Sequence, residues 1–88
     1  MEDYEKEILI RMYDKGIMGM NYKSIQTVAS KIKWVEILNK FHLKKSFQST
    51  IRNLIKKELV SDHGKSGNVC SLTADGVKYV KFLKFKIA

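Results

Sequence analysis

The chain has 88 residues, of which 44% are hydrophobic and 30% charged, with a formal net charge of +8. This length supplies one hydrophobic core and predicts a single domain over residues 1–88. No apolar run approaches the roughly 20 residues of a membrane span, so we expect no transmembrane helix. The acidic start is unlike a signal peptide, so we expect no signal peptide either. A single cysteine, Cys70, excludes an internal disulfide framework and predicts a reducing location, the cytoplasm.

The charge is unevenly distributed along the chain. Residues 1–14 hold five acids and two bases, a net charge of −3, so residues 15–88 carry +11. A cationic body behind an acidic leading segment indicates a polyanionic partner. A lysine-rich surface that only maintains solubility gives the same composition, so the charge alone leaves both interpretations open.

Residues 3–15 are predicted to form the first helix. Asp3 is the expected N-cap, since early acids suit the positive end of the helix dipole. Gly16 is expected to end the helix in a left-handed conformation, and residues 17–20 then form a short apolar connector. The inward-facing residues have helical spacing and are Tyr4, Ile8 and Met12.

The next segment is predicted to be helical, with Asn21 as its N-cap. Apolar residues keep the helical period from Tyr22 almost to Phe41. The pattern fits one long helix or two with a bend near residues 31–34, because weak helix formers precede that point. In the second case residues 33–40 form a short helix, and residues 41–43 turn the chain with Leu43 against the core. Tyr22 and Trp34 are expected in the core or half-buried at its edge.

A basic amphipathic helix is predicted at residues 46–58. Ser46 is the expected N-cap, and the buried face comprises Phe47, Ile51, Leu54 and Ile55. No acidic residue occurs between Glu36 and Glu58. The opposite face carries side chains that can reach base edges and phosphates, namely Gln48, Ser49, Arg52, Asn53 and Lys56. This composition favours a DNA recognition helix over a merely solvated face.

After residue 58 the sequence pattern changes, and it predicts a β-hairpin followed by a helix. Residues 59–63 and 69–72 are predicted strands, joined by a turn at residues 64–68 that is rich in glycine, serine and asparagine. Thr73 is the expected N-cap of a final helix from Ala74. Its predicted buried stripe is Val77, Val80, Leu83 and Ile87, widened by Tyr79 and Phe82.

This order of elements resembles the winged helix-turn-helix family over about residues 33–80. Two motifs carry the resemblance: Ile51-x-x-Leu54-x-x-x-x-Leu59-Val60, and Leu72-Thr73-Ala74-Asp75-Gly76 followed by Tyr79. Small archaeal, viral and plasmid regulators are the members it looks most like. The resemblance implies a mainly α fold with a small β-hairpin (α+β), and a possible homodimer through the first and last helices. Glu58 departs from the pattern, since the family usually has glycine there.

We therefore expect a sequence-specific double-stranded DNA-binding protein, a transcription regulator. Helix 46–58 would enter the major groove, where Gln48, Ser49 and Arg52 meet base edges, and hairpin 59–72 would form the wing. Basic side chains would neutralise phosphates. The candidate DNA-binding residues are Lys44, Lys45, Ser46, Gln48, Ser49, Arg52, Asn53, Lys56 and, in the wing, Lys65.

Other classes of function have less support in the sequence. His42, His63 and Cys70 lack the paired close spacing of metal ligands, so no metal site is expected. No carboxylate pair, nucleophile motif or phosphate-binding loop indicates an enzyme or a cofactor. Two alternatives stay open: a winged-helix protein-interaction module in a replication, transcription or membrane-remodelling assembly, and a non-specific architectural or RNA-binding protein.

Overall fold

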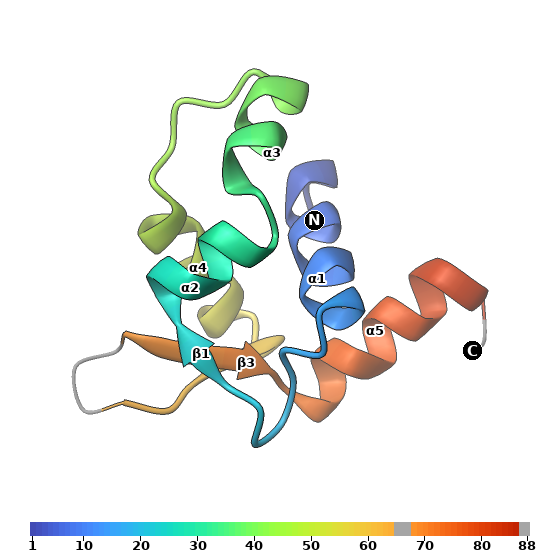
Figure 1. The fold of residues 1–88 in the computed structure, drawn as a ribbon. Coiled ribbons are helices and arrows are strands. Elements are labelled where there is room, and N and C mark those ends of the chain that lie inside the picture. The colour runs from blue at the N-terminus through green and yellow to red at the C-terminus, as the bar shows by residue number, and fades with distance from the viewer. Residues whose placement is uncertain (65–67, 87–88) are drawn as a thin grey trace.

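The computed structural model describes residues 1–64 and 68–86. Its helices lie above and to one side of a small antiparallel sheet in the view of Figure 1. Over these residues there are five helices and one three-stranded sheet, so the predicted α+β class is confirmed. The elements in chain order are α1 (Asp3–Asp14), β1 (Lys23–Ser24), α2 (Ile25–Lys31), α3 (Trp34–Phe41), α4 (Phe47–Lys56), β2 (Val60–Asp62), β3 (Val69–Leu72) and α5 (Ala74–Phe85).

α1 begins and ends through local hydrogen bonds. Its N-cap is Glu2, whose backbone amide donates to Oε1 of Glu5 at 3.0 Å. The prediction of Asp3 as N-cap was therefore wrong by one residue, because the reciprocal Glu2–Glu5 capping box uses the earlier position. Gly16 has φ 71° and ends the helix as predicted, a conformation that costs glycine little.

The segment after the connector starts with a strand, where a helix was predicted. β1 precedes α2, and the N-cap of α2 is Ser24, whose hydroxyl accepts from the Thr27 amide at 3.1 Å. Asn21 is not a cap; its side-chain amide donates to the Gly16 carbonyl at 2.5 Å. Tyr22 is also more exposed than expected, at 41%, and its ring stacks on His63 with centroids 4.6 Å apart.

The sheet has the strand order β1-β3-β2, with both neighbouring pairs antiparallel. Val60 lies opposite Leu72 and Asp62 opposite Cys70, which confirms the predicted hairpin. On its other side β3 pairs with the short β1, which brings Lys23 opposite Cys70. The predicted wing contact Lys65 lies outside the described residues.

The helical stretch between β1 and α4 consists of two helices. α2 ends at its C-cap Ile32, and Lys33 takes a left-handed conformation with φ 57° before α3 begins. The break therefore falls where one of the two open predictions placed it. Trp34 is buried, and Leu43 packs against the core after α3, as expected.

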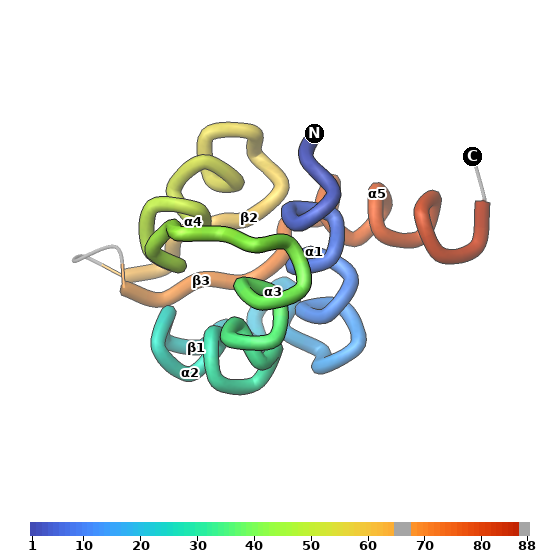
Figure 2. Tube along the Cα trace, turned by 90° about the horizontal axis from the view of Figure 1, so that it is seen from above, coloured from blue at the N-terminus to red at the C-terminus, as the bar shows by residue number. Residues whose placement is uncertain are grey.

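α5 is confirmed as a helix capped by Thr73, whose hydroxyl accepts from the Gly76 amide at 2.9 Å. Val80 is fully buried, but Phe82 is 50% exposed, so its predicted place in the buried stripe was wrong. The reason is visible in Figures 1 and 2: the C-terminal part of α5 extends beyond the rest of the domain. Ile87 lies outside the described residues.

The core is shared by all the helices and by β2 and β3. Its largest fully buried side chains are Ile8, Leu9, Met12, Ile17, Val28, Ile32, Ile37, Ile51, Leu54, Val60, Leu72 and Val80. Within the described ranges, no helix has both the length and the apolar composition required to cross a bilayer.

The exit from α4 makes a left-handed turn at a residue that is not glycine. Glu58 has φ 62°, its amide donates to the Ile55 carbonyl at 2.9 Å, and the Leu59 amide donates to the Leu54 carbonyl at 3.2 Å. These two bonds form a Schellman motif, whose left-handed position is usually glycine. Glu58 thus takes a backbone conformation that is usual for glycine.

Replacing Glu58 with glycine is expected to raise the free energy of unfolding by about 1 kcal/mol, because the left-handed conformation is costly for residues with a Cβ. Urea unfolding followed by circular dichroism measures the change. Glu58→Ala is the matched control, since it removes the same charge but keeps the Cβ. Equal stability of the two variants would show that the backbone conformation is not the cause.

Candidate nucleic-acid interface

α4 separates its apolar and polar side chains onto opposite faces. Phe47, Ile51 and Leu54 are buried, as predicted, and Ile55 is half-buried against the core. The exposed side chains are the predicted ones: Gln48, Ser49, Arg52, Asn53 and Lys56. The geometry thus leaves the polar face of α4 uncovered by the described part of the chain.

Two of the predicted site residues build the start of α4. The Ser46 hydroxyl accepts from the Ser49 amide at 3.1 Å, which confirms Ser46 as N-cap. The Ser49 hydroxyl in turn donates to the Ser46 carbonyl at 3.1 Å. Both hydroxyls therefore already have partners within the helix, so their first role is to start α4 at this point.

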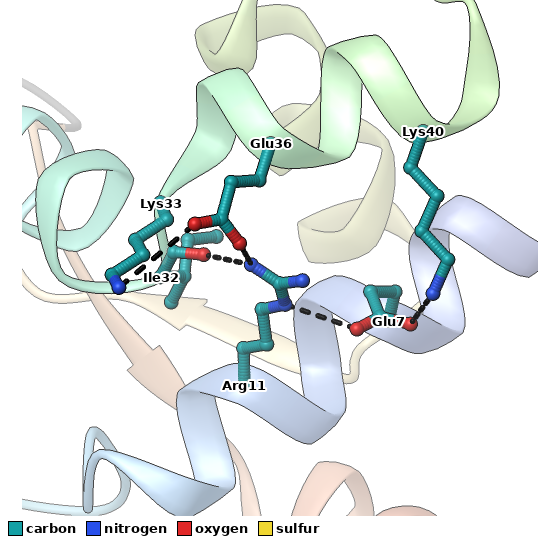
Figure 3. Close-up of polar contacts among 6 residues, drawn as sticks. All are labelled: Glu7, Arg11, Ile32, Lys33, Glu36 and Lys40. Atoms are coloured by element: carbon teal, nitrogen blue, oxygen red, sulfur yellow. Dashed lines mark hydrogen bonds and ion pairs between the residues drawn. The ribbon is translucent and has the colours of Figure 1, made fainter.

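The carboxylates of α1 and α3 gather around Arg11 (Figure 3). Its guanidinium lies 3.0 Å from the Glu7 carboxylate and 3.2 Å from that of Glu36, and it donates to the Ile32 carbonyl at 2.9 Å. Lys40 binds Glu7 from α3 at 3.2 Å. Burial disfavours ionisation of Glu7, but the bonds from Arg11 and Lys40 outweigh it and lower the pKa of this carboxyl. The cluster fixes α1 against the α2–α3 break.

A second ionic contact holds α1 against the end of α4. Glu5 is only 3% exposed, and its carboxylate accepts from the Lys57 ammonium at 2.9 and 3.1 Å. Burial disfavours its charged form, but the bonds from Lys57 and from the Glu2 amide outweigh burial and lower the pKa of Glu5. The pair joins residues 52 positions apart and orients α4.

Acid is expected to weaken the fold through Glu5. Its pKa is lower in the folded chain than the ordinary value of 4.5, so its contribution is present above pH 4.5 and is lost as the pH falls through the folded pKa. Glu5→Gln should cost about 2 kcal/mol at pH 7, and the deficit should shrink toward pH 3. Urea unfolding at both pH values measures this. The exposed Glu58→Gln is the control, and a deficit that is equal at both pH values would contradict the assignment.

The lysine and arginine side chains differ in whether a carboxylate lies within ion-pair distance. Ion pairs within 4.0 Å hold Lys6, Arg11, Lys33, Lys40, Lys57 and Lys84. Among the described residues, ten cations have no such pair: Lys15, Lys23, Lys31, Lys44, Lys45, Arg52, Lys56, Lys78, Lys81 and Lys86. Lys15 and the three lysines of α5 and its C-cap lie outside α4 and its neighbouring segments, and Lys45 bonds to Tyr4. The other five are here called the open cations: Lys23, Lys31, Lys44, Arg52 and Lys56. The open cations come from β1, α2, α4 and the turn before α4, so the uncompensated positive charge includes the polar face of α4.

Lys45 differs from its neighbour Lys44. Its ammonium donates to the Tyr4 hydroxyl at 2.8 Å and lies 4.9 Å from the centre of the Tyr4 ring. The hydrogen bond to Tyr4 raises the pKa of Lys45. Lys45 thus points to α1, and contact with a phosphate requires it to leave Tyr4.

The start of α2 and the hairpin lie beside α4. Both views place α2, α4 and the beginning of β3 at one end of the molecule, opposite the C-terminal part of α5 (Figures 1 and 2). A hollow of about 240 Å³, here called the amide hollow, is lined by Ser24, Ile25, Gln26, Gln48 and Asn68. Of these residues, the sequence prediction included only Gln48. The Ser24-x-x-Thr27 cap is the signal that could have revealed Ser24, Ile25 and Gln26, because it places them at a helix start. No local signal places Asn68 beside them.

Other chemistries find little support in the described residues. No three His, Cys, Asp or Glu side chains come close enough there to hold a metal ion. Burial and the nearby Asp62 charge raise the pKa of the Cys70 thiol to about 11, which disfavours the reactive thiolate.

Comparisons with protein-family models, curated proteins and solved structures find no match for the chain.

Proposed function

We propose that the chain is a winged helix-turn-helix protein that binds double-stranded DNA sequence-specifically and regulates transcription. α4 enters the major groove, and the β2–β3 hairpin acts as the wing. The observation that carries the proposal is the exposed, acid-free polar face of α4, which displays Arg52 and Lys56 together with carboxamides. Side chains of these types bond to base edges and phosphates.

The arrangement around α4 supports this use. The element order and the sheet order β1-β3-β2 place a hairpin after α4, and α2 packs against α4. α4 is held by a buried apolar face and by the Glu5–Lys57 pair, so its polar face is presented in a fixed orientation. A rigid helix with uncompensated charge suits insertion between two phosphate backbones.

Arg52 is the residue expected to contribute most to base recognition. It is exposed near the middle of α4 and makes no ion pair within the described residues, so its guanidinium is available for bidentate bonds to guanine. Arg52→Ala should cost about 1–3 kcal/mol on the preferred sequence and relax preference at one base position.

Lys56→Ala is the matched control for Arg52→Ala, because a lost phosphate contact weakens all sequences alike. Selection of bound fragments from random duplex DNA, followed by anisotropy titration with each variant, measures both effects. Unchanged affinity and preference in Arg52→Ala would show that another surface reads the sequence.

A second candidate function is protein interaction through the end of α5. Phe82 and Phe85 are 50% and 53% exposed there, beside Lys78, Lys81 and Lys86. Such a basic aromatic surface suits an acidic protein partner. Titration against random duplex at low salt separates the candidates: absence of a complex at micromolar protein favours protein interaction. Equal competition by single-stranded DNA or RNA would instead favour a non-specific nucleic-acid-binding role.

A further inference from the structure

The amide hollow lies where three separate segments meet. Gln26 comes from the first turn of α2, Gln48 from the first turn of α4, and Asn68 from the residue before β3. The Ile25 amide donates to the Asn68 carbonyl at 2.7 Å, which ties the start of α2 to the residue before β3. Carboxamides that are distant in sequence thus converge on one space.

The lining of the hollow carries no ionisable group. Its polar side chains are one hydroxyl and three carboxamides, and Ile25, 9% exposed, adds an apolar surface. The Ser24 hydroxyl already bonds within its cap. No hydrogen bond joins the side chains of Gln26, Gln48 or Asn68 to another described residue. Each carboxamide therefore offers a donor and an acceptor to a ligand.

The chemistry of the lining favours one edge of duplex DNA. A carboxamide pairs with adenine, donating to N7 and accepting from N6, and an apolar side chain suits the thymine methyl group in the major groove. A cationic side chain binds phosphate more strongly than a carboxamide does, and no cationic side chain lines this hollow. A volume of about 240 Å³ is also below the roughly 300–1,000 Å³ of enclosed small-molecule sites.

We infer that the amide hollow recognises an A·T base pair, with Gln26, Gln48 and Asn68 as the residues that set this preference. The inference rests on the proposed DNA-binding function and makes it more specific. It divides the surface into two parts: the open cations contact phosphates and guanine, and the hollow reads adenine and thymine.

The test compares the wild-type chain with the Q26A/Q48A/N68A variant, using selected duplexes and all single-base substitutions of them. We expect the variant to lose about fivefold or more of the discrimination at one or two A·T positions, while its salt dependence stays that of wild type. Lys44→Ala is the control, expected to weaken every duplex alike and to reduce the salt slope by about 1. Q48E is expected to shift preference toward cytosine, since a carboxylate only accepts hydrogen bonds.

The outcomes separate this inference from the proposed function. If wild type binds duplexes with a clear preference and the triple variant keeps that preference at every position, the inference is wrong and the proposed function stands. A lower salt slope in the triple variant would show that the hollow contacts a phosphate. That result would also overturn the inference that the hollow recognises an A·T base pair. If wild type forms no complex with any duplex, the proposed function itself fails. The three residues are exposed, and circular dichroism of Q48E and the triple variant checks that both retain the fold.

Discussion

Gly76→Ala is expected to lower the free energy of unfolding by about 3 kcal/mol, the range reached when a core is overfilled. An added Cβ at this position would lie 2.1 Å from the Leu59 carbonyl oxygen and 3.3 Å from Cδ2 of Leu72. The first distance is far inside van der Waals contact, and the obstructing atom belongs to the backbone. The helix α5 and the exit from α4 would have to separate to admit a methyl group.

The surrounding hydrogen bonds prevent an easy separation. The Leu59 carbonyl accepts from the Thr73 amide at 3.1 Å, and the Thr73 hydroxyl donates to the Glu58 carbonyl at 2.8 Å. The same hydroxyl caps α5 by accepting from the Gly76 amide. Moving Gly76 away from Leu59 would therefore strain the cap of α5 and the turn after α4 together.

Guanidinium unfolding monitored at 222 nm measures the loss in Gly76→Ala. Gly64→Ala is the matched control: its Cβ would meet Val69 at an ordinary 3.5 Å, so a change below about 0.5 kcal/mol is expected. Similar midpoints for the two variants would show that α5 can shift without cost, contrary to the close packing described here.

This glycine also shows what a sequence motif conveys. The Leu72-Thr73-Ala74-Asp75-Gly76 motif correctly predicted a helix capped by Thr73, because capping depends on residues close in sequence. The need for glycine arises from a contact between Gly76 and Leu59, 17 positions apart, which local sequence does not reveal. For the same reason, the spacing of apolar residues predicted which face of α4 is buried. It did not predict the contact with Glu5 that orients α4, because Glu5 lies 52 positions from Lys57.

The sequence was least informative where distant segments decide the local structure. Residues 23 and 24 form a strand because β3 offers them hydrogen-bonding partners, and a two-residue strand has no alternation to detect. The break after α2 is stabilised by Arg11, which donates to the Ile32 carbonyl from 21 residues away. The contact of Lys45 with phosphate stays a prediction, but the hydrogen bond from its ammonium to Tyr4, 41 residues earlier, was not foreseen. The candidate site was thus predictable on α4 and incomplete beside it.

Duplex affinity is expected to fall about a thousandfold between 50 and 200 mM salt, with a log–log slope near −5. The estimate takes about six phosphate contacts, each contributing roughly −0.9 to the slope through released counterions. The open cations Lys23, Lys31, Lys44 and Lys56 are candidates for four of these contacts, since Arg52 is assigned to guanine. Lys45, once it leaves Tyr4, is the candidate for the fifth. Lys65, outside the described residues, is the candidate for the sixth.

A comparison of two cationic surfaces tests whether the salt dependence arises at α4 or also at α5. Anisotropy titrations of a labelled duplex at several salt concentrations give the slope for each variant. Lys44→Ala with Lys56→Ala should reduce its magnitude by about 2, whereas Lys78→Ala with Lys81→Ala on α5 should leave it unchanged. Both pairs remove the same charge, so total charge cannot explain a difference between them. An equal reduction by the two pairs would mean that the whole cationic surface attracts DNA and that α4 does not direct the contact.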